Sequence, residues 1–296
     1  MEQRFLDPKV LASISSLDLL ARTVVDGFVA GLHRSPDFAF SHEFAEYRVY
    51  SPGDDLRHVD WNLYARSERM YLKRFRGETN SQLTVLLDAS NSMQYASGKT
   101  TKMDYARYVA ASLFYLAIRK QRDAAGLIVF DDEVRDYVRP STRQGQLARL
   151  FASLDGAEPH ARTDLAKPMR HFQELLRRRG IAIVISDFYE DPEAVVKAIE
   201  PLRFHGNEVV LFQVLDPQEI RPVLKEAAVL VDLETDERIE VVPDYAKTTY
   251  REKMDAHIEA LRTRARGAGM DYQLLVTDQP LDNALREYLT LRKGKS

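Results

Sequence analysis

Three oxygen-bearing side chains, Asp88, Ser90 and Ser92, stand at alternate positions in the segment Asp88-Ala89-Ser90-Asn91-Ser92. They directly follow 83–87, an apolar run that is typical of a strand buried on both faces of a sheet. A carboxylate and two hydroxyls are hard oxygen ligands, of the kind that Mg²⁺ and Ca²⁺ take in proteins. Because open α/β sheets bind ligands in the loops at the carboxyl ends of their strands, this segment predicts a metal site.

The same segment has a purely structural alternative, in which a serine caps the following helix and Asp88 only ends a strand. Two other loops weigh against it. Thr163 and Asp164 come just before a predicted helix that starts at Leu165, and Asp187 follows the apolar run 181–185. Three loops then offer oxygen ligands to one rim of the sheet, which favours the metal site over the cap.

The elements that must position these residues follow from the apolar pattern. Near-continuous apolar runs predict buried parallel strands at 83–87, 125–130, 181–185 and 209–212. Helical patterns lie between and after them, at 102–119, 144–154, 165–179 and 192–202. This alternation predicts an α/β fold with a doubly wound, mainly parallel sheet, to which 134–138 adds a short edge strand.

Two further regions flank this pattern. At the N-terminus the spacing of apolar residues predicts one helix from Asp7 to about Gly31, and 35–79 reads as loops and short strands. Near the other end, two short strand patterns around a polar turn predict a hairpin insertion at about 228–243. A helix at 245–266, a strand at 272–276 and a helix at 281–291 follow. We therefore expect an N-terminal extension, 1–79, packed on an α/β domain, 80–296.

Composition limits the function classes. The 296 residues contain no cysteine, which excludes disulfides, thiolate zinc sites and a cysteine nucleophile. A formal net charge of −3 does not favour nucleic acid as a partner. No apolar stretch reaches the roughly 18 residues that cross a bilayer, and the first residues lack the pattern of a secretion signal. The expectation is a cytoplasmic protein without membrane insertion.

These positions resemble the von Willebrand factor type A domains that carry a metal-ion-dependent adhesion site. The resemblance implies a Rossmann-like fold and Mg²⁺, or alternatively Mn²⁺ or Ca²⁺, held by Asp88, Ser90, Ser92, Thr163 and Asp187. It also implies that the two serines bind the ion directly and that the two aspartates act largely through water. An open coordination position would then accept a carboxylate from a partner. The glycines that the family carries beside the threonine are missing here.

A second resemblance, to domain of unknown function family 58, spans nearly the whole chain. It is carried by residues of the N-terminal region that include Arg48, Tyr50, Gly53, Asp54, Asp55, Arg57, Asp60, Trp61 and Arg66. Members carry a type A-like domain and are commonly associated with MoxR-type AAA+ ATPases. The resemblance implies an adaptor or co-chaperone that links such an ATPase to client proteins. The alternating charges around Trp61 favour a structural brace that clamps the N-terminal segment onto the domain, with an interaction role as the alternative.

Parts of the sequence also match enzyme motifs incompletely. The segment Ser97-Gly98-Lys99-Thr100 looks like the end of a P-loop, but Met93 stands where the first glycine is required. We therefore expect Lys99 and Lys102 at a solvated helix start. Ser90 occupies the position of the general acid of haloacid dehalogenase-type phosphatases, and no Gly-x-Ser-x-Gly segment exists. No catalytic residue and no organic cofactor are predicted. The competing function is a metal-dependent, phosphoesterase-like hydrolase of unknown substrate.

Overall fold

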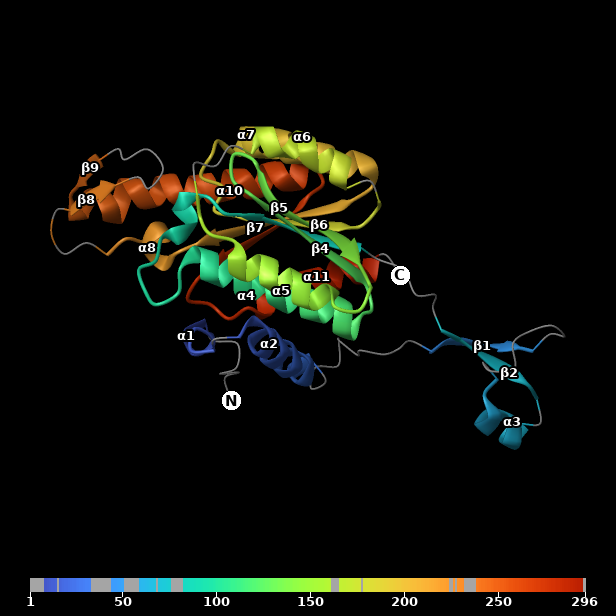
Figure 1. Ribbon diagram of the computed structural model, residues 1–296. Coiled ribbons are helices and arrows are strands. Elements are labelled where there is room, and N and C mark those ends of the chain that lie inside the picture. The colour runs from blue at the N-terminus through green and yellow to red at the C-terminus, as the bar shows by residue number, and fades with distance from the viewer. Residues whose placement is uncertain are drawn as a thin grey trace.

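A six-stranded sheet forms the centre of the computed structural model (Figure 1). The structure describes residues 8–14, 16–32, 44–50, 59–67, 69–75, 82–160, 165–176, 178–223, 226, 228–231 and 238–294. The sheet consists of β3 (Gln82–Asp88), β4 (Ala124–Phe130), β5 (Val134–Ser141), β6 (Ile181–Ser186), β7 (Glu208–Leu215) and β10 (Asp271–Val276). Its order is β10-β7-β6-β3-β4-β5, and only β5 runs antiparallel to its neighbour. The predicted α/β class and parallel sheet are confirmed.

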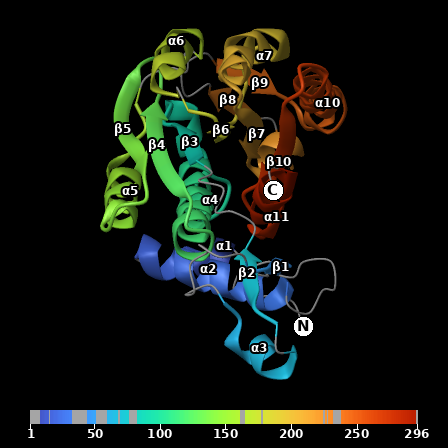
Figure 2. The same ribbon diagram turned by 90° about the vertical axis from the view of Figure 1, so that its right-hand side faces the viewer.

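Helices cover both faces of the sheet, as Figure 2 shows along the strands. One layer holds α4 (Lys102–Tyr115), α5 (Gln146–Gly156) and α11 (Asp282–Gly294), and the other holds α6 (Ala166–Leu175), α7 (Pro192–Ile199) and α10 (Arg251–Gly267). Each layer seals its own hydrophobic core, which is why β3, β6 and β7 are buried along nearly their whole length and consist mostly of apolar residues.

Strand order creates a switch point between β3 and β6. From β3 the chain passes through α4 to β4, whereas from β6 it passes through α7 to β7 on the other side. Because α4 and α7 lie on opposite faces, the two connections leave from neighbouring strands in opposite directions. In open α/β sheets this is the place where the loops part and ligands bind.

Element ends differ from the prediction mainly where helices change their winding. α4 continues as a π-helical turn, η4 (Leu116–Lys120), and α7 as a 3-10 turn, η5 (Glu200–His205). Before α10 lie α9 (Pro243–Tyr245) and the π-helical turn η6 (Ala246–Tyr250). The predicted hairpin is present as β8 (Ala228–Val231), paired antiparallel with β9 (Arg238–Val241), and α8 (Pro217–Ile220) precedes it.

The single N-terminal helix predicted from Asp7 to Gly31 is wrong, since the structure has two helices there. They are α1 (Pro8–Leu11) and α2 (Leu17–Leu32). Serine side chains explain the break: Ser13 Oγ donates to the carbonyl of Val10 at 2.7 Å, and Ser16 Oγ accepts from the amide of Leu19 at 3.4 Å, as an N-cap does. The apolar face of α2 is buried in the same core as α4, beneath which α2 lies in Figure 1.

A small unit formed by β1 (Phe44–Val49), α3 (Trp61–Ser67) and β2 (Tyr71–Phe75) lies away from the large sheet (Figure 1). Trp61 is 53% exposed and meets the ring of Tyr64 edge-on, with 6.1 Å between centroids. The brace that Trp61 would form against the α/β domain stays a prediction. Asp60 is buried and accepts from the amide of Leu63 at 3.1 Å, which caps α3.

Gly53, Asp54, Asp55 and Arg57 lie outside the described residues. Among the helices that the structure describes, none has the length and apolar character to cross a membrane.

Candidate metal site

Asp88, the last residue of β3, lies at the switch point with its side chain fully buried. Its Oδ1 accepts from the amide of Ser90 at 2.8 Å, and its Oδ2 accepts from Oγ of Ser186 at 2.5 Å. Burial and the negative charge of Asp187 raise the pKa of Asp88 to about 7, against the opposing effect of these hydrogen bonds. The site thus holds two neighbouring carboxylates whose repulsion a bound cation would relieve.

Ser90 and Ser92 turn their hydroxyls toward each other. Their Oγ atoms are 3.0 Å apart, and Ser90 is fully buried. Ser90 precedes the short 3-10 helix η3 (Asn91–Gln94), but its side chain makes no capping hydrogen bond there. The cap of α4 is Thr101, whose Oγ1 accepts from the amide of Asp104 at 2.9 Å. The capping alternative therefore does not account for Ser90, and its hydroxyl is directed into the rim.

Asp187 follows β6 and brings the second carboxylate to the same rim. Its Oδ2 accepts from Nζ of Lys102 at 2.8 Å, and its backbone carbonyl accepts from Nε2 of Gln213 at 2.8 Å. The expectation that Lys102 sits on a solvated helix start is wrong, since its side chain is fully buried. Helical periodicity contains the signal that was missed: Lys102 is in phase with Tyr105 and Val109 on the apolar face of α4.

Lys102 also binds a second carboxylate, which the sequence pattern did not suggest. Its Nζ lies 2.7 Å from Oε1 of Glu219 and 4.8 Å from the ring centroid of Tyr189. Burial disfavours the charged amine, but Asp187 and Glu219 outweigh it and raise the pKa of Lys102 above its ordinary value. Lys102 is therefore a buried ammonium group inside the candidate site.

Glu219 belongs to a capping box at α8. Oε2 of Glu219 accepts from the amide of Asp216 at 2.8 Å, and Oδ1 of Asp216 accepts from the amide of Gln218 at 2.8 Å. Asp216 also receives the amide of Ser97 at 2.9 Å and its hydroxyl at 2.5 Å. These contacts fix the loop after η3 against the end of β7.

A polar residue follows the carboxyl end of each neighbouring parallel strand, from Asp131 after β4 to Asp216 after β7. Asp131 accepts from Nε of Arg135 at 2.6 Å and from the amide of Glu133 at 2.9 Å, so its carboxylate is already saturated by local donors. Asp88 also accepts hydrogen bonds on both oxygens, but it differs from Asp131 because the charge of a second carboxylate, Asp187, raises its pKa. The candidate site is therefore centred on β3 and β6 rather than spread along the rim.

The residues that are brought together fit a divalent cation with mixed ligands. Asp88, Ser90, Ser92 and Asp187 lie at the carboxyl ends of β3 and β6, and the ligand atoms that their side chains offer are all hard oxygens. Within the described part of the chain, no group of three or more His, Asp or Glu side chains is arranged to hold a metal. A cation held here would therefore need serine hydroxyls among its ligands. Thr163, the fifth predicted ligand, lies outside the described residues.

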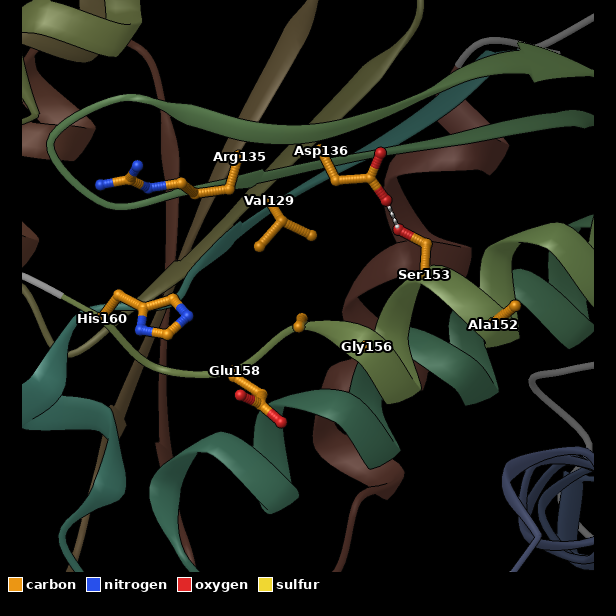
Figure 3. A pocket seen from close by; sticks show the side chains of 9 residues that line it. Val129, Arg135, Asp136, Ala152, Ser153, Gly156, Glu158 and His160 are labelled. Atoms are coloured by element: carbon orange, nitrogen blue, oxygen red, sulfur yellow. Dashed lines mark hydrogen bonds between the residues drawn. The ribbon is translucent and has the colours of Figure 1, made fainter.

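A hollow of about 500 Å³ lies between β5 and the segment that follows α5 (Figure 3), and the Asp88–Ser92 loop does not line it. His160 connects the two, because its amide donates to the carbonyl of Ala89 at 2.8 Å. The walls carry both charges, with Arg135 and His160 toward one end and Glu158 below them in the view, while Asp136 accepts a hydrogen bond from Ser153.

Relatives of the whole chain come from mycobacteria. Uncharacterized proteins of Mycobacterium tuberculosis and Mycobacterium bovis are 28% identical over 294 residues, which covers 97% of this chain and 92% of theirs.

Solved structures that are similar include BatB from Bacteroides thetaiotaomicron, a conserved hypothetical protein, with 15% identity and a TM-score of 0.48. It covers 73% of this chain and 100% of that one. The type A domain SpRpn10 is 11% identical at a TM-score of 0.42, covering 70% of this chain and 94% of that one. A von Willebrand factor type A protein from Catenulispora acidiphila is 15% identical at a TM-score of 0.36, and the match covers 61% of this chain and 42% of that one.

The family is established by a model that describes a protein of unknown function, DUF58, and that matches residues 46–265. This range contains Asp60 and Trp61 of the N-terminal signature together with all the candidate metal ligands. Because the match covers well over half of the sequence, the chain belongs to the DUF58 family.

Proposed function

We propose that this chain is a metal-dependent protein-interaction module that works as an adaptor or co-chaperone for a MoxR-type AAA+ ATPase. The observation that carries the proposal is the site at the switch point, where two carboxylates, Asp88 and Asp187, and the paired hydroxyls of Ser90 and Ser92 lie at the ends of β3 and β6, with the charge of Asp187 acting on buried Asp88. Mg²⁺, or Mn²⁺ or Ca²⁺, is the group proposed there.

The residues divide the work of holding the ion. Ser90 and Ser92 present their hydroxyls as direct ligands, and Asp88 and Asp187 hold ordered water by their carboxylates. Thr163 is the proposed fifth contributor. When bound, the ion supplies a positive charge that few anionic protein ligands offset, so it attracts an additional carboxylate. The local donors that already hold Asp88 in place mean that the loop needs little rearrangement to bind.

A partner's Asp or Glu is the proposed ligand for the open position. A charge-assisted contact of this kind is stronger in a partly desolvated rim than in water. The hollow beside His160 gives room for the residues that flank such a carboxylate. We propose the ATPase or one of its client proteins as the source of this acidic residue.

Surface plasmon resonance with a purified MoxR-type ATPase from the same genome tests the proposal. The chain is immobilised, binding is recorded in millimolar Mg²⁺, and the ion is then removed with a chelator. We expect binding in Mg²⁺ and rapid dissociation in chelator, with loss of binding in the double variant Ser90→Ala, Ser92→Ala. Binding that persists in chelator and in the double variant would show that the ion plays no part in recognition.

The same preparation distinguishes the competing hydrolase. The described residues near Asp88 include the ammonium group of Lys102, but this group is bound to two carboxylates and is not placed as a base. We therefore expect no steady turnover of phosphoesters. Turnover that requires Mg²⁺ and disappears in Asp88→Ala would favour the hydrolase instead.

A further inference from the structure

Lys102 is the buried cation of the candidate site. Its side chain has no exposed surface, although it begins a helix that follows a surface loop. A lysine that is buried so completely requires charge partners, because an unpaired ammonium group in the protein interior is strongly destabilising. Here the two partners are Asp187 at 2.8 Å and Glu219 at 2.7 Å.

One of these partners is a residue proposed for the metal. The carboxylate of Asp187 would therefore interact with two cations. One is the ammonium group of Lys102, whose Nζ contacts Oδ2, and the other is the proposed metal ion. The other partner, Glu219, does not belong to the metal loop, and its second oxygen caps α8 through the amide of Asp216. Lys102 therefore joins the metal loops to the β7–α8 loop.

We infer that Lys102 weakens cation binding at this site, because its ammonium group competes with the ion for Asp187. This inference rests on the proposed metal site. It explains how Asp187 remains compensated without metal, so that the loops keep their shape and the ion can come and go. Glu219 moderates the competition, since it shares the ammonium group and draws part of its charge away from Asp187.

Two substitutions should change affinity in opposite directions. Lys102→Met keeps the length and apolar stem of the side chain but removes the charge, so affinity for Mn²⁺ should rise by about tenfold or more, given the strength of charge pairs at such distances. Glu219→Gln keeps the shape of the capping side chain but removes a negative charge and leaves Lys102 to Asp187 alone. Affinity should therefore fall.

Electron paramagnetic resonance of free Mn²⁺, with the full chain, measures these affinities directly. Lys99→Met is the matched control, because Lys99 is exposed and lies outside the pairs, so it should match the wild type. The double variant Asp88→Asn, Lys102→Met should lose the gained affinity, which locates the ion. Near-ultraviolet circular dichroism reports whether Lys102→Met is folded. If it is not, the change in Mn²⁺ affinity of Glu219→Gln alone tests the competition.

The outcomes separate this inference from the proposed function. Wild-type binding with unchanged affinity in both Lys102→Met and Glu219→Gln would overturn the competition while leaving the metal site in place. Binding only in Lys102→Met would support the competition and show that the ammonium group blocks the wild-type site. No Mn²⁺ binding by any of these chains would overturn the metal site and the inference together.

Discussion

Oγ of Ser186 donates a 2.5 Å hydrogen bond to Oδ2 of Asp88, and so joins the ends of β6 and β3 at the switch point of the sheet. The same Oγ accepts from the amide of Phe188 at 3.1 Å. Asp88 is therefore fixed before any ligand arrives, with a second carboxylate, Asp187, beside it. Two carboxylates that are already held in place favour cation binding. The ion then does not have to order them, and it relieves the repulsion between their charges.

The raised pKa of Asp88 predicts that Asp88→Asn stabilises the metal-free protein at neutral and higher pH. An ordinary aspartate has a pKa of 3.8, and this one is raised to about 7, so the folded protein binds the proton more tightly than the unfolded chain does. Between these two values, stability contributed by the protonated form is lost as pH rises. Asparagine keeps a hydrogen-bond acceptor and a donor at this position, as a protonated aspartate does. Because it does not ionise, the variant does not lose this stability as pH rises.

Urea unfolding at pH 5 and pH 8, in the presence of chelator, checks this prediction. The wild type should lose more stability than Asp88→Asn between the two pH values. A wild type that gains stability relative to the variant over this interval would mean that Asp88 is ionised at little cost in the fold.

The sheet could be predicted from sequence because its strands are buried on both faces. Runs such as 181–185 have no polar interruption, and this feature distinguishes a central parallel strand from other elements. The order of strands could not be predicted, since no pattern within β3 or β6 records its neighbour. The switch point that gathers Asp88 and Asp187 therefore became visible only in the structure.

The residues of the candidate site also differ in how far the sequence could predict them. Asp88, Ser90 and Ser92 share one loop, so their spacing was informative. Lys102 and Glu219 are 117 positions apart and meet only through the packing of α4 against the end of β7. Lysine side chains are usually solvated, so the sequence predicts Lys102 at a solvated helix start although its side chain is buried.

Ser90→Ala should weaken Mn²⁺ binding by about tenfold, because one of two directly coordinating hydroxyls is lost. The change in fold stability should be small, since the hydroxyl caps no helix in the structure and its partners are the side chains of Ser92 and Asp88. Asn91→Ala is the control in the same loop, as Asn91 is not a proposed ligand. Equal Mn²⁺ affinity in both variants, measured by equilibrium dialysis, would remove Ser90 from the ligand set.

Gly126→Ala in β4 should destabilise the fold by about 1–3 kcal/mol through overpacking. A Cβ at this position would stand 2.5 Å from Cγ of Pro140 on the neighbouring strand, in a ring that cannot move aside freely. Gly98→Ala is the matched control, because nothing lies within 4 Å of its added Cβ. Thermal unfolding of both variants gives the comparison, and a Gly126→Ala that melts like Gly98→Ala would place Pro140 elsewhere.

Calorimetric titration of the wild-type chain with Mg²⁺ and Mn²⁺ tests the central claim most directly. The account predicts saturable heat for one site, a rise in melting temperature at millimolar metal, and loss of both effects in the double variant Ser90→Ala, Ser92→Ala. Absence of heat and of thermal stabilisation in the wild type would contradict the metal site, and with it the interaction mechanism that depends on the ion.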